Sequence, residues 1–355
     1  MNANYTTNKI LIDWLSFTDF TTNNAEDVIA YLGLDDVNFI QCDGNKGYLY
    51  KYTFSGININ FGGKDSVWVE MSGAGCRAFE DFSKLLGDGI GDKWYTLLSY
   101  LLLVGYERGT NKAIFRSRDE ITFNRIDIAY DDFNYLIDLD LIVCNCLKRN
   151  IVSKFGDKRN KNNGGYGLIT QNVGESFIGI NVMFGTRKSD TYMRCYDKAV
   201  ERERQDEISH WVRWEIVLKR DRAYEFIKLL ITDNKTIDIL FFLVLNNYIR
   251  FVDLENCKDS NKSRAKMFDW WEKFAFSVTS DKVSLWVSPG GIYNFKKLKN
   301  YVENMAGGAI FTYCRCFGVD DLFDNVAYHE NKLNVKYRVL LAEYTEKLKN
   351  KGDSE

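Results

Sequence analysis

The sequence predicts an α+β protein with an antiparallel sheet at its core, helices flanking that sheet, and a mainly helical C-terminal region. Two observations predict this class. Stretches in which polar and apolar residues alternate recur up to residue 232 and are separated by glycine-containing turns. From residue 234 onward the spacing of apolar residues becomes helical. We therefore expect a sheet-centred domain over residues 1–232 and a mainly helical accessory region over residues 233–355.

Strands are expected where residues alternate, because successive side chains of a strand point to opposite faces of a sheet. The first such stretch, KILIDWLSFT, places Ile10, Ile12 and Trp14 on one face. Gly62 and Gly63 divide two hairpin strands. The expected strands cover residues 9–18, 48–61, 67–71, 124–132, 166–172, 176–185, 191–198 and 210–219.

Helices are expected where apolar residues recur every three or four positions, or where a capping residue precedes such a stretch. Asn24 is placed to cap the first helix, and Phe226, Leu229 and Leu230 form the apolar stripe of a later one. Pro289 marks a turn in the C-terminal region. The expected helices cover residues 25–32, 72–82, 94–104, 134–150, 197–205, 221–232, 237–248, 263–274, 294–305 and 328–347.

One strand carries an unusual combination of side chains, in the stretch RKSDTYMRCYDKAVERE at residues 187–203. Two phenols and two cations share one of its faces, namely Tyr192, Arg194, Tyr196 and Lys198. A tyrosine can attack a phosphodiester and hold the broken strand as a phosphotyrosine, while cations bind the phosphoryl oxygens. A tyrosine-rich sheet face surrounded by solvated charges is the alternative interpretation.

Two further strands place carboxylates and arginines together on one face. In NRIDIAYDD that face carries Arg125, Asp127, Ala129 and Asp131, and in HWVRWEIVLK it carries Trp211, Arg213, Glu215 and Val217. Brought side by side, Asp127 and Glu215, with Asp131 as a further ligand, offer the hard oxygen atoms that suit Mg²⁺ or Mn²⁺. Pairing of arginine with carboxylate between neighbouring strands is the alternative.

The order of these stretches resembles a known family. RIDIAYD, RKSDTYMRCYDKAVE and HWVRWEI, with SGAGCR upstream, are similar to the replication initiation factor family (Rep_trans) of rolling-circle initiators and related relaxases. The resemblance runs from about Met71 to Leu230 and more loosely to Lys273. It implies metal-dependent nicking of one strand at an origin, with a tyrosine left on the 5′ phosphate.

The resemblance also implies roles for individual residues. The family nucleophile has the context tyrosine, Asp or Asn, Lys, which here is Tyr196-Asp197-Lys198, and Tyr192 is the second candidate. Arg194, Lys198 and Arg213 would surround the phosphoryl oxygens, although Arg213 has orientation of Glu215 as an alternative role. Better-known tyrosine nickases carry paired histidines, whereas His210 and His329 are far apart in this sequence.

DNA binding has to come from local basic segments, because the formal net charge of the chain is −2. The loop KFGDKRNKNNGG, at residues 154–165, has the composition of a segment that follows a phosphate backbone, and a solvated loop without a partner is the alternative. The resemblance favours a DNA contact for Arg77 over an ordinary turn. The candidate contacts are Arg77, Lys154, Lys158, Arg159, Lys161, Arg187 and Lys188.

Cysteine spacing and the apolar segments indicate where in the cell the protein is expected. The eight cysteines form no CxxC pair, the N-terminus has no signal-peptide pattern, and no apolar run approaches the roughly 20 residues of a membrane span. We therefore expect a cytoplasmic protein with reduced thiols. No GxxxxGK[ST] motif occurs, so a host helicase or an extruded hairpin has to supply single-stranded origin DNA. A homodimer is also a candidate assembly.

Three alternatives to origin nicking stay open at this level. A relaxase for conjugative transfer uses the same chemistry. A non-catalytic DNA-binding regulator binds DNA without any covalent adduct. A carboxylate-dependent nuclease that uses water cleaves DNA even when both tyrosines are removed.

Overall fold

The computed structural model divides the chain into two compact units, Met1–Trp286 and Val287–Glu355. It describes the ranges and single residues 7–85, 90–110, 112–155, 166–173, 176–232, 236–257, 259, 261, 264–276, 298–299, 301–327 and 341. Each unit is considered by itself. Among the helices of these described residues, none is both long enough and apolar enough to cross a membrane.

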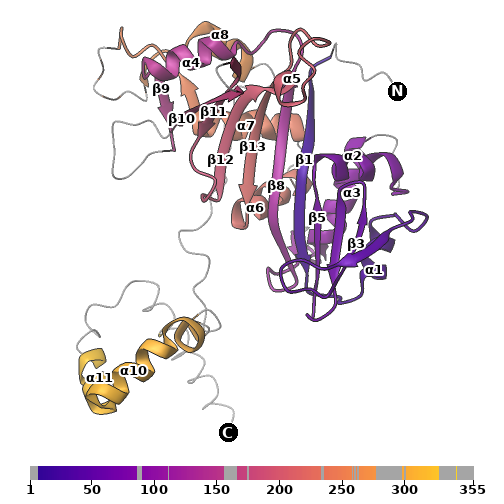
Figure 1. Cartoon of the computed structure of the whole chain (residues 1–355), viewed down its shortest axis with the longest axis vertical. Coiled ribbons are helices and arrows are strands. Elements are labelled where there is room, and N and C mark those ends of the chain that lie inside the picture. The colour runs from indigo at the N-terminus through magenta and orange to yellow at the C-terminus, as the bar shows by residue number, and fades with distance from the viewer. Residues whose placement is uncertain are drawn as a thin grey trace. The chain divides into compact units, whose positions relative to one another are not determined.

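A ten-stranded antiparallel sheet forms the centre of the first unit and confirms the predicted α+β class (Figure 1). Its strand order is β10-β11-β12-β13-β8-β1-β5-β4-β3-β2. The strands are β1 (Lys9–Asp19), β2 (Ile40–Asp43), β3 (Tyr50–Phe54), β4 (Ile57–Phe61), β5 (Val67–Met71), β8 (Ile121–Asp132), β10 (Tyr166–Val173), β11 (Ser176–Phe184), β12 (Thr191–Asp197) and β13 (Val212–Lys219).

The two halves of this sheet repeat one order of elements. Each half begins with a long strand and a helix, β1 with α1 (Ala25–Tyr31) and β8 with α4 (Leu139–Leu147). Four strands of the large sheet follow in each half, preceded in the second half by β9 of a small sheet, and the last of the four pairs with the first strand of its half. A helix then begins: α2 (Gly73–Phe82) or α6 (Asp221–Thr232). The two halves meet where β1 and β8 pair antiparallel. In the second half β13 lies next to β8 and β12 next to β13, just as β5 lies next to β1 and β4 next to β5 in the first half.

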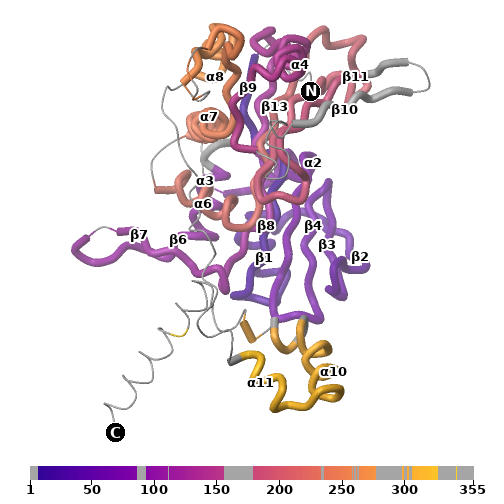
Figure 2. Tube along the Cα trace, turned by 90° about the vertical axis from the view of Figure 1, so that its left-hand side faces the viewer, coloured from indigo at the N-terminus to yellow at the C-terminus, as the bar shows by residue number. Residues whose placement is uncertain are grey.

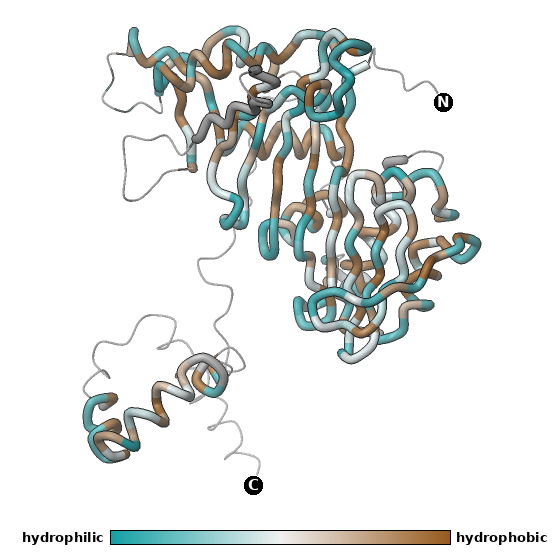
Figure 3. Tube along the Cα trace, in the orientation of Figure 1, coloured by the Kyte–Doolittle hydropathy of each residue, from teal (hydrophilic) through white to brown (hydrophobic). Residues whose placement is uncertain are grey.

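Helices cover one face of the sheet, and α6 and α7 lie behind it in Figure 1. The apolar side chains of the strands point to this face, and hydrophobic and hydrophilic residues alternate along several strands in Figure 3. Trp214 of β13 is fully buried there and stacks on Phe184, with ring centroids 5.5 Å apart. The remaining helices of the unit are α3 (Ile90–Leu102), α5 (Lys198–Glu201), α7 (Ile237–Tyr248) and α8 (Asp269–Ala275).

Helices α7 and α8 belong to the sheet-centred unit, which differs from the boundary expected after residue 232. Phe241 and Phe242 of α7 lie against Tyr130 of β8, with ring centroids 6.0 and 5.6 Å away. Trp271 of α8 is also fully buried and lies 5.4 Å from the Trp214 ring. Without α7 and α8, the rings of Tyr130 and Trp214 on the sheet would be exposed to water on this side. The first unit accordingly includes both helices and extends to Trp286.

The first strand departs from simple alternation. A bulge between Ile12 and Trp14 shifts the register with β8, so that Trp14 lies opposite Asp127. Ile12 faces the core, whereas the Trp14 ring lies 4.7 Å from the Arg125 guanidinium on the other face. The prediction that Ile10, Ile12 and Trp14 share one face was therefore wrong for Trp14, because the sequence gives no sign of the inserted residue.

Most predicted helices appear with shifted ends. The helix predicted over 134–150 is α4, and the one predicted over 263–274 begins only at Asp269. The helix predicted over 294–305 is helical at its described residues, 298–299 and 301–305, the latter as part of a π-helix, whereas the one predicted over 328–347 lies outside the described residues except for position 341. Pro289 also lies outside them. The described elements of the second unit are the π-helix η2 (Tyr301–Ala306), α10 (Gly307–Phe317) and α11 (Val319–Ala327).

Two small sheets accompany the large one. β6 (Leu103–Tyr106) and β7 (Ala113–Phe115) form a hairpin that projects from the first unit in Figure 2. β9 (Ile151–Ser153) pairs with β14 (Ile249–Phe251).

Replacing Phe241 by alanine tests whether α7 is part of the core. We expect Phe241→Ala to lower the free energy of unfolding by about 3–5 kcal/mol, because a buried aromatic ring is removed from a packed site. The matched control is Phe311→Ala on α10, whose side chain is 68% exposed and whose loss should change stability little. Chemical denaturation of both variants measures the difference, and equal effects would contradict the assignment of α7 to the first unit.

Candidate active site

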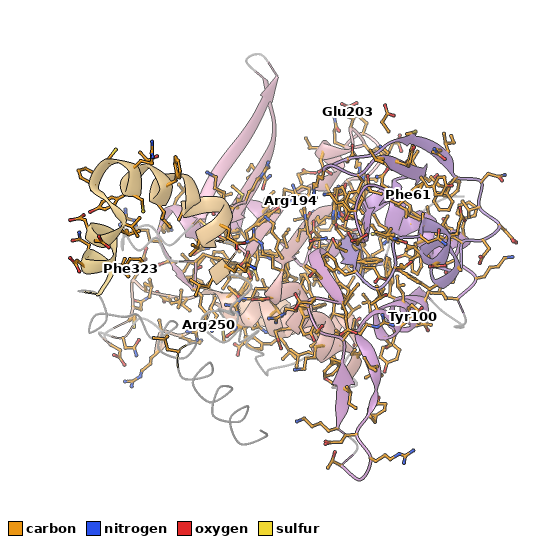
Figure 4. All side chains as sticks on the ribbon, turned by 90° about the horizontal axis from the view of Figure 1, so that it is seen from below. Phe61, Tyr100, Arg194, Glu203, Arg250 and Phe323 are labelled. Atoms are coloured by element: carbon orange, nitrogen blue, oxygen red, sulfur yellow. The ribbon has the colours of Figure 1, made fainter. Side chains whose placement is uncertain are left out.

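The structure brings the three polar strands together on the face of the sheet opposite the main core. β13 lies between β12 and β8, so its side chains contact both. Three rows cross these strands in the order β12, β13, β8: Tyr192–Val217–Asp127, Arg194–Glu215–Ala129 and Tyr196–Arg213–Asp131. Arg194 lies among the strands of the first unit in Figure 4.

Tyr196 is almost fully buried, with 3% of its surface exposed, yet it has polar partners. Its hydroxyl donates to Glu215 Oε2 at 3.2 Å and accepts from Lys198 Nζ at 3.4 Å. Burial, followed by the negative charge of Glu215, raises the pKa of Tyr196 above its ordinary value, against the opposing effect of nearby arginines. The phenol is therefore protonated at neutral pH, with a proton acceptor already in place.

Lys198 is the second buried polar group at this position. It is 3% exposed, and its ammonium group also donates to Glu201 at the end of α5. Burial and the charge of Arg213 lower the pKa of Lys198. The lysine thus links the tyrosine hydroxyl to Glu201, whose side chain is 39% exposed.

Every carboxylate that was predicted to bind metal has an arginine partner instead. Arg125 donates twice to Asp127 on the same strand, at 2.7 and 2.5 Å. Arg194 donates to Glu215 Oε2 at 2.7 Å. These contacts match the alternative of paired arginines and carboxylates, and they neutralise charges that would be costly to bury alone.

Arg213 is shared between two carboxylates. It donates to both oxygens of Asp131, at 2.6 and 2.8 Å, and its remaining nitrogen lies 2.7 Å from Asp13 Oδ2. Asp131 is fully buried, and Arg213 is 4% exposed. Asp13 was not among the predicted site residues, although alternation places it with Lys9 and Leu11 on the face opposite Ile10 and Ile12. The sequence does not show that β1 pairs with β8, which is what brings Asp13 close to Arg213.

The predicted metal set does not form a ready ligand cluster. In the described parts of the chain, no three His, Cys, Asp or Glu side chains come together to hold an ion. Both oxygens of Asp131 accept from Arg213, and both oxygens of Asp127 accept from Arg125. Asp131 fits a metal less well than Asp127 because Arg213 is 4% exposed and is also paired with Asp13, whereas Arg125 is 28% exposed. Glu215 Oε1 is buried with no hydrogen-bond partner, and burial together with Glu215 and Asp13 raises the pKa of Asp127 to about 8 despite Arg125. Asp127 and Glu215 are therefore the two members whose surroundings would favour an added cation.

Tyr192 lies four residues before Tyr196 on the same face and is 5% exposed. Its neighbour on β13 is Val217, and Lys219 Nζ lies 5.2 Å from the centre of its ring. Burial raises the pKa of Tyr192. The hydroxyl of Tyr196, by contrast, is held between the carboxylate of Glu215 and the ammonium group of Lys198. This difference favours Tyr196 over Tyr192 as the nucleophile.

The predicted DNA contacts are dispersed over the first unit. Arg77 of α2 donates to the Ile12 carbonyl oxygen and to Glu80, and it lines a cavity beside Asp13. Lys154 donates to Asn247, near the small β9–β14 sheet. Arg187 and Lys188 are exposed in the turn before β12. The other three, Lys158, Arg159 and Lys161, lie outside the described residues.

Comparison with known proteins agrees with this arrangement. A model of the family described as replication initiation factor matches residues 121–313, which is more than half of the chain. The chain belongs to this family. A second model, the rolling circle replication initiation protein N-terminal domain, matches residues 9–100. The first match begins where β8 begins, so the two models divide the sheet where its two halves meet.

Individual relatives of the family cover most of the chain. A putative DNA relaxase, NicK, of Bacillus subtilis (strain 168) is 25% identical over 347 residues, covering 94% of this chain and 89% of the relative. The solved structure of a rolling circle replication initiator protein from Geobacillus stearothermophilus is 26% identical, with a TM-score of 0.62. That match covers 79% of this chain and 100% of the other.

Removing the shared arginine tests the electrostatic balance of the site. We expect Arg213→Met to lower the free energy of unfolding by about 3–5 kcal/mol, because Asp131 is left buried without its partner. The control is Arg118→Met, whose partner Asp221 lies 3.0 Å away at a largely exposed position and whose loss should cost about 0–1 kcal/mol. Urea denaturation of the two variants gives both values. A small effect for Arg213→Met would mean that the buried carboxylates are protonated in the folded protein.

Proposed function

We propose that this protein nicks and rejoins one strand of DNA at an origin, through a 5′-phosphotyrosine on Tyr196. The observation that carries the proposal is the position of the Tyr196 hydroxyl between Glu215 and Lys198, with Arg194 over its ring at 4.7 Å. Membership of the replication initiation factor family supports the same chemistry. The substrate is single-stranded origin DNA, or the single-stranded part of an extruded hairpin.

The bonds exchanged in the proposed step are those of a single phosphoryl transfer. Tyr196 Oη attacks phosphorus and gives its proton to Glu215 Oε2, the acceptor 3.2 Å away. The bond from phosphorus to the 3′ oxygen breaks, and that oxygen takes a proton from water. The strand is then held by its 5′ phosphate, and rejoining reverses each transfer, with Glu215 returning the proton to the leaving phenolate.

Fixed positive charge accompanies this transfer. Lys198 lies 3.4 Å from the tyrosine oxygen and would stabilise negative charge there during rejoining. Arg194 is 24% exposed, so its outer face remains accessible to a phosphoryl oxygen while it holds Glu215. Arg213 pairs with Asp131 of β8 and Asp13 of β1 and so fixes the position of these side chains next to Tyr196. We therefore assign it a positioning role rather than direct contact with DNA.

Dependence on Mg²⁺ or Mn²⁺ is a separate part of the proposal. Asp127 and Glu215 would hold the ion, since Glu215 Oε1 is buried without a partner, and burial together with the charge of Glu215 raises the pKa of Asp127, so that an added cation would favour its ionised form. When bound, the ion would supply positive charge beside the scissile phosphate. Asp131 is left out of this set because its partner Arg213 is buried and fixed by Asp13 as well, whereas Arg125, the partner of both Asp127 oxygens, is 28% exposed.

The biological setting has two candidate forms with one chemistry. The names of the relatives divide between relaxase and rolling circle replication initiator, so initiation of replication and conjugative transfer are both consistent with nicking at Tyr196. A host helicase or a supercoil-extruded hairpin would supply single strands, because the sequence has no nucleotide-binding motif of the GxxxxGK[ST] type. Origin recognition by the region after residue 232 and formation of a homodimer remain predictions.

Loss of one phenol tests the proposed nucleophile. The wild-type protein, incubated with Mn²⁺ and a labelled single-stranded oligonucleotide from the origin of its element, should form an adduct that survives SDS. Tyr196→Phe should abolish the adduct, because the ring is retained and only the attacking oxygen is lost. Tyr192→Phe is the matched control and should retain most of the activity.

The other outcomes separate the alternatives. An adduct lost in Tyr192→Phe and kept in Tyr196→Phe would move the nucleophile to Tyr192. Cleavage that survives loss of both tyrosines would indicate a nuclease that uses water. Tight binding of a confirmed origin without any cleavage would indicate a DNA-binding regulator.

Chelation and two matched carboxylate variants test the metal. EDTA should abolish adduct formation, and added Mn²⁺ or Mg²⁺ should restore it. Asp127→Asn should raise the Mn²⁺ concentration needed for half-maximal activity about 10-fold or more, because one charged ligand is lost. Asp131→Asn should leave that concentration within about twofold while reducing stability. Full activity in EDTA would exclude the metal, and equal metal requirements in the two variants would exclude the proposed ligands.

A further inference from the structure

A cavity of about 810 Å³ opens beside Tyr196, between β1, α2 and the segment that joins β12 to β13. This volume lies within the range of about 300–1,000 Å³ that is usual for sites of small ligands. Lys198 and Arg213 belong to both the cavity wall and the tyrosine site. Any strand whose phosphate reaches Tyr196 therefore has this cavity as its immediate neighbour.

The lining of the cavity is strongly basic for a chain whose formal net charge is −2. Three acidic residues line it, namely Asp13, Asp81 and Asp131. Six basic residues line it, namely Lys9, Arg77, Lys198, Arg202, Arg204 and Arg213. The cavity therefore favours an anionic ligand. Its local excess of positive charge would allow a chain of nearly zero net charge to bind DNA at this place.

The basic residues occupy two levels of the cavity. Lys198 and Arg213 form its floor; they are 3% and 4% exposed, and they pair with Glu201, which is partly exposed, and with the buried Asp131. Arg202 and Arg204 stand nearer the solvent, with 56% and 37% of their side chains exposed. Arg202 Nε is 3.9 Å from the nearest oxygen of Glu201, a long ion pair that leaves the guanidinium available to another anion.

Aromatic rings complete the wall. Phe82, the last residue of α2, lines the cavity although it is 54% exposed. The ring of Phe54 meets it edge-on, with centroids 5.3 Å apart, and so fixes its orientation. Trp211 is a second, buried wall residue that packs on Phe133 at 5.5 Å. An exposed and oriented ring beside arginines is the combination that binds unpaired bases by stacking and their phosphates by charge.

We propose that this cavity binds an unpaired DNA nucleotide next to the scissile phosphate, with its base on Phe82 and its phosphate on Arg202, since Arg204 already donates twice to Glu207. A base can reach the Phe82 ring only outside a duplex, since in a duplex its faces are covered by neighbouring bases. The link to the scissile phosphate rests on the proposed nicking at Tyr196. Binding of the single strand itself does not require nicking, so the two claims can be tested apart.

The test measures affinity for fluorescein-labelled (dT)20 in the Tyr196→Phe background, where no covalent adduct contributes. Phe82→Ala with Arg202→Ala removes one ring and one cation from the cavity. Tyr106→Ala with Arg108→Ala is the matched control, because it removes one exposed ring and one arginine from the β6–β7 hairpin. Thermal unfolding of both double variants checks that each remains folded.

The cavity variant should bind (dT)20 about 5- to 150-fold more weakly, the range expected for losing one stacked base. Its affinity should also depend less on salt, with the slope of log K against log salt smaller by about 0.7 for the lost phosphate contact. The control should bind within about twofold of the parent. A (dT)20 carrying one 5-iododeoxyuridine should cross-link on irradiation to Phe82 or Trp211.

Three results would overturn the inference: no binding of (dT)20 by the parent, equal affinities of the cavity and control variants, or cross-links confined to residues outside the cavity. Failure of the nicking proposal looks different. A protein that binds (dT)20 through Phe82 and Arg202 but never forms an adduct keeps the binding site and loses the enzyme. A protein that forms the adduct while the cavity variant binds normally keeps the enzyme and loses this site.

Discussion

The candidate site depends on the pairing of buried carboxylates with arginines across neighbouring strands. Asp127, Asp131 and Glu215 are each at most 2% exposed, and an isolated carboxylate in such a place would be protonated or would destabilise the fold. A single guanidinium, that of Arg213, pairs with two acidic side chains, Asp131 and Asp13. Because β13 lies at the centre of these rows, a change in its register would separate Glu215 from Arg194 and Arg213 from its two carboxylates at once.

The same pairs give the tyrosine its chemical setting. Glu215 accepts hydrogen bonds from Arg194 and Tyr196, and its negative charge raises the pKa of that phenol in addition to the effect of burial. The phenol is therefore protonated at neutral pH, and in the proposed reaction it would lose its proton only when a phosphate is bound. Lys198 also donates to the hydroxyl oxygen of Tyr196. The oxygen therefore has a proton acceptor in Glu215 and, in the proposed reaction, a hydrogen-bond donor that would stabilise the phenolate.

Alternation of residues was sufficient to predict the polar face, because β8, β12 and β13 keep a period of two across the site, but it missed the edge strand β2 of the large sheet. It could not predict the position of Trp14, since a bulge inserts a residue without any mark in the sequence, nor that β1 pairs with β8 and so brings Asp13 to Arg213. It also could not show that α7 packs on the sheet, because a helix that is apolar nearly all round is compatible with any buried place. Alternation places Trp211 on the face of Arg213, but it gives no position for Arg202, because α5 ends at Glu201 and the helix expected over 197–205 does not continue through Arg202.

Titration of the Tyr196 phenol tests the central claim most directly. Tyrosine labelled with ¹³C at Cζ, with the resonance assigned by its loss in Tyr196→Phe, reports ionisation of this single residue. The account predicts a pKa above the ordinary value of about 10, and a lower pKa in Glu215→Gln, because the adjacent negative charge is removed. A pKa at or below the ordinary value, or one that does not respond to loss of Glu215, would show that the buried hydrogen bond between these two residues does not exist in solution.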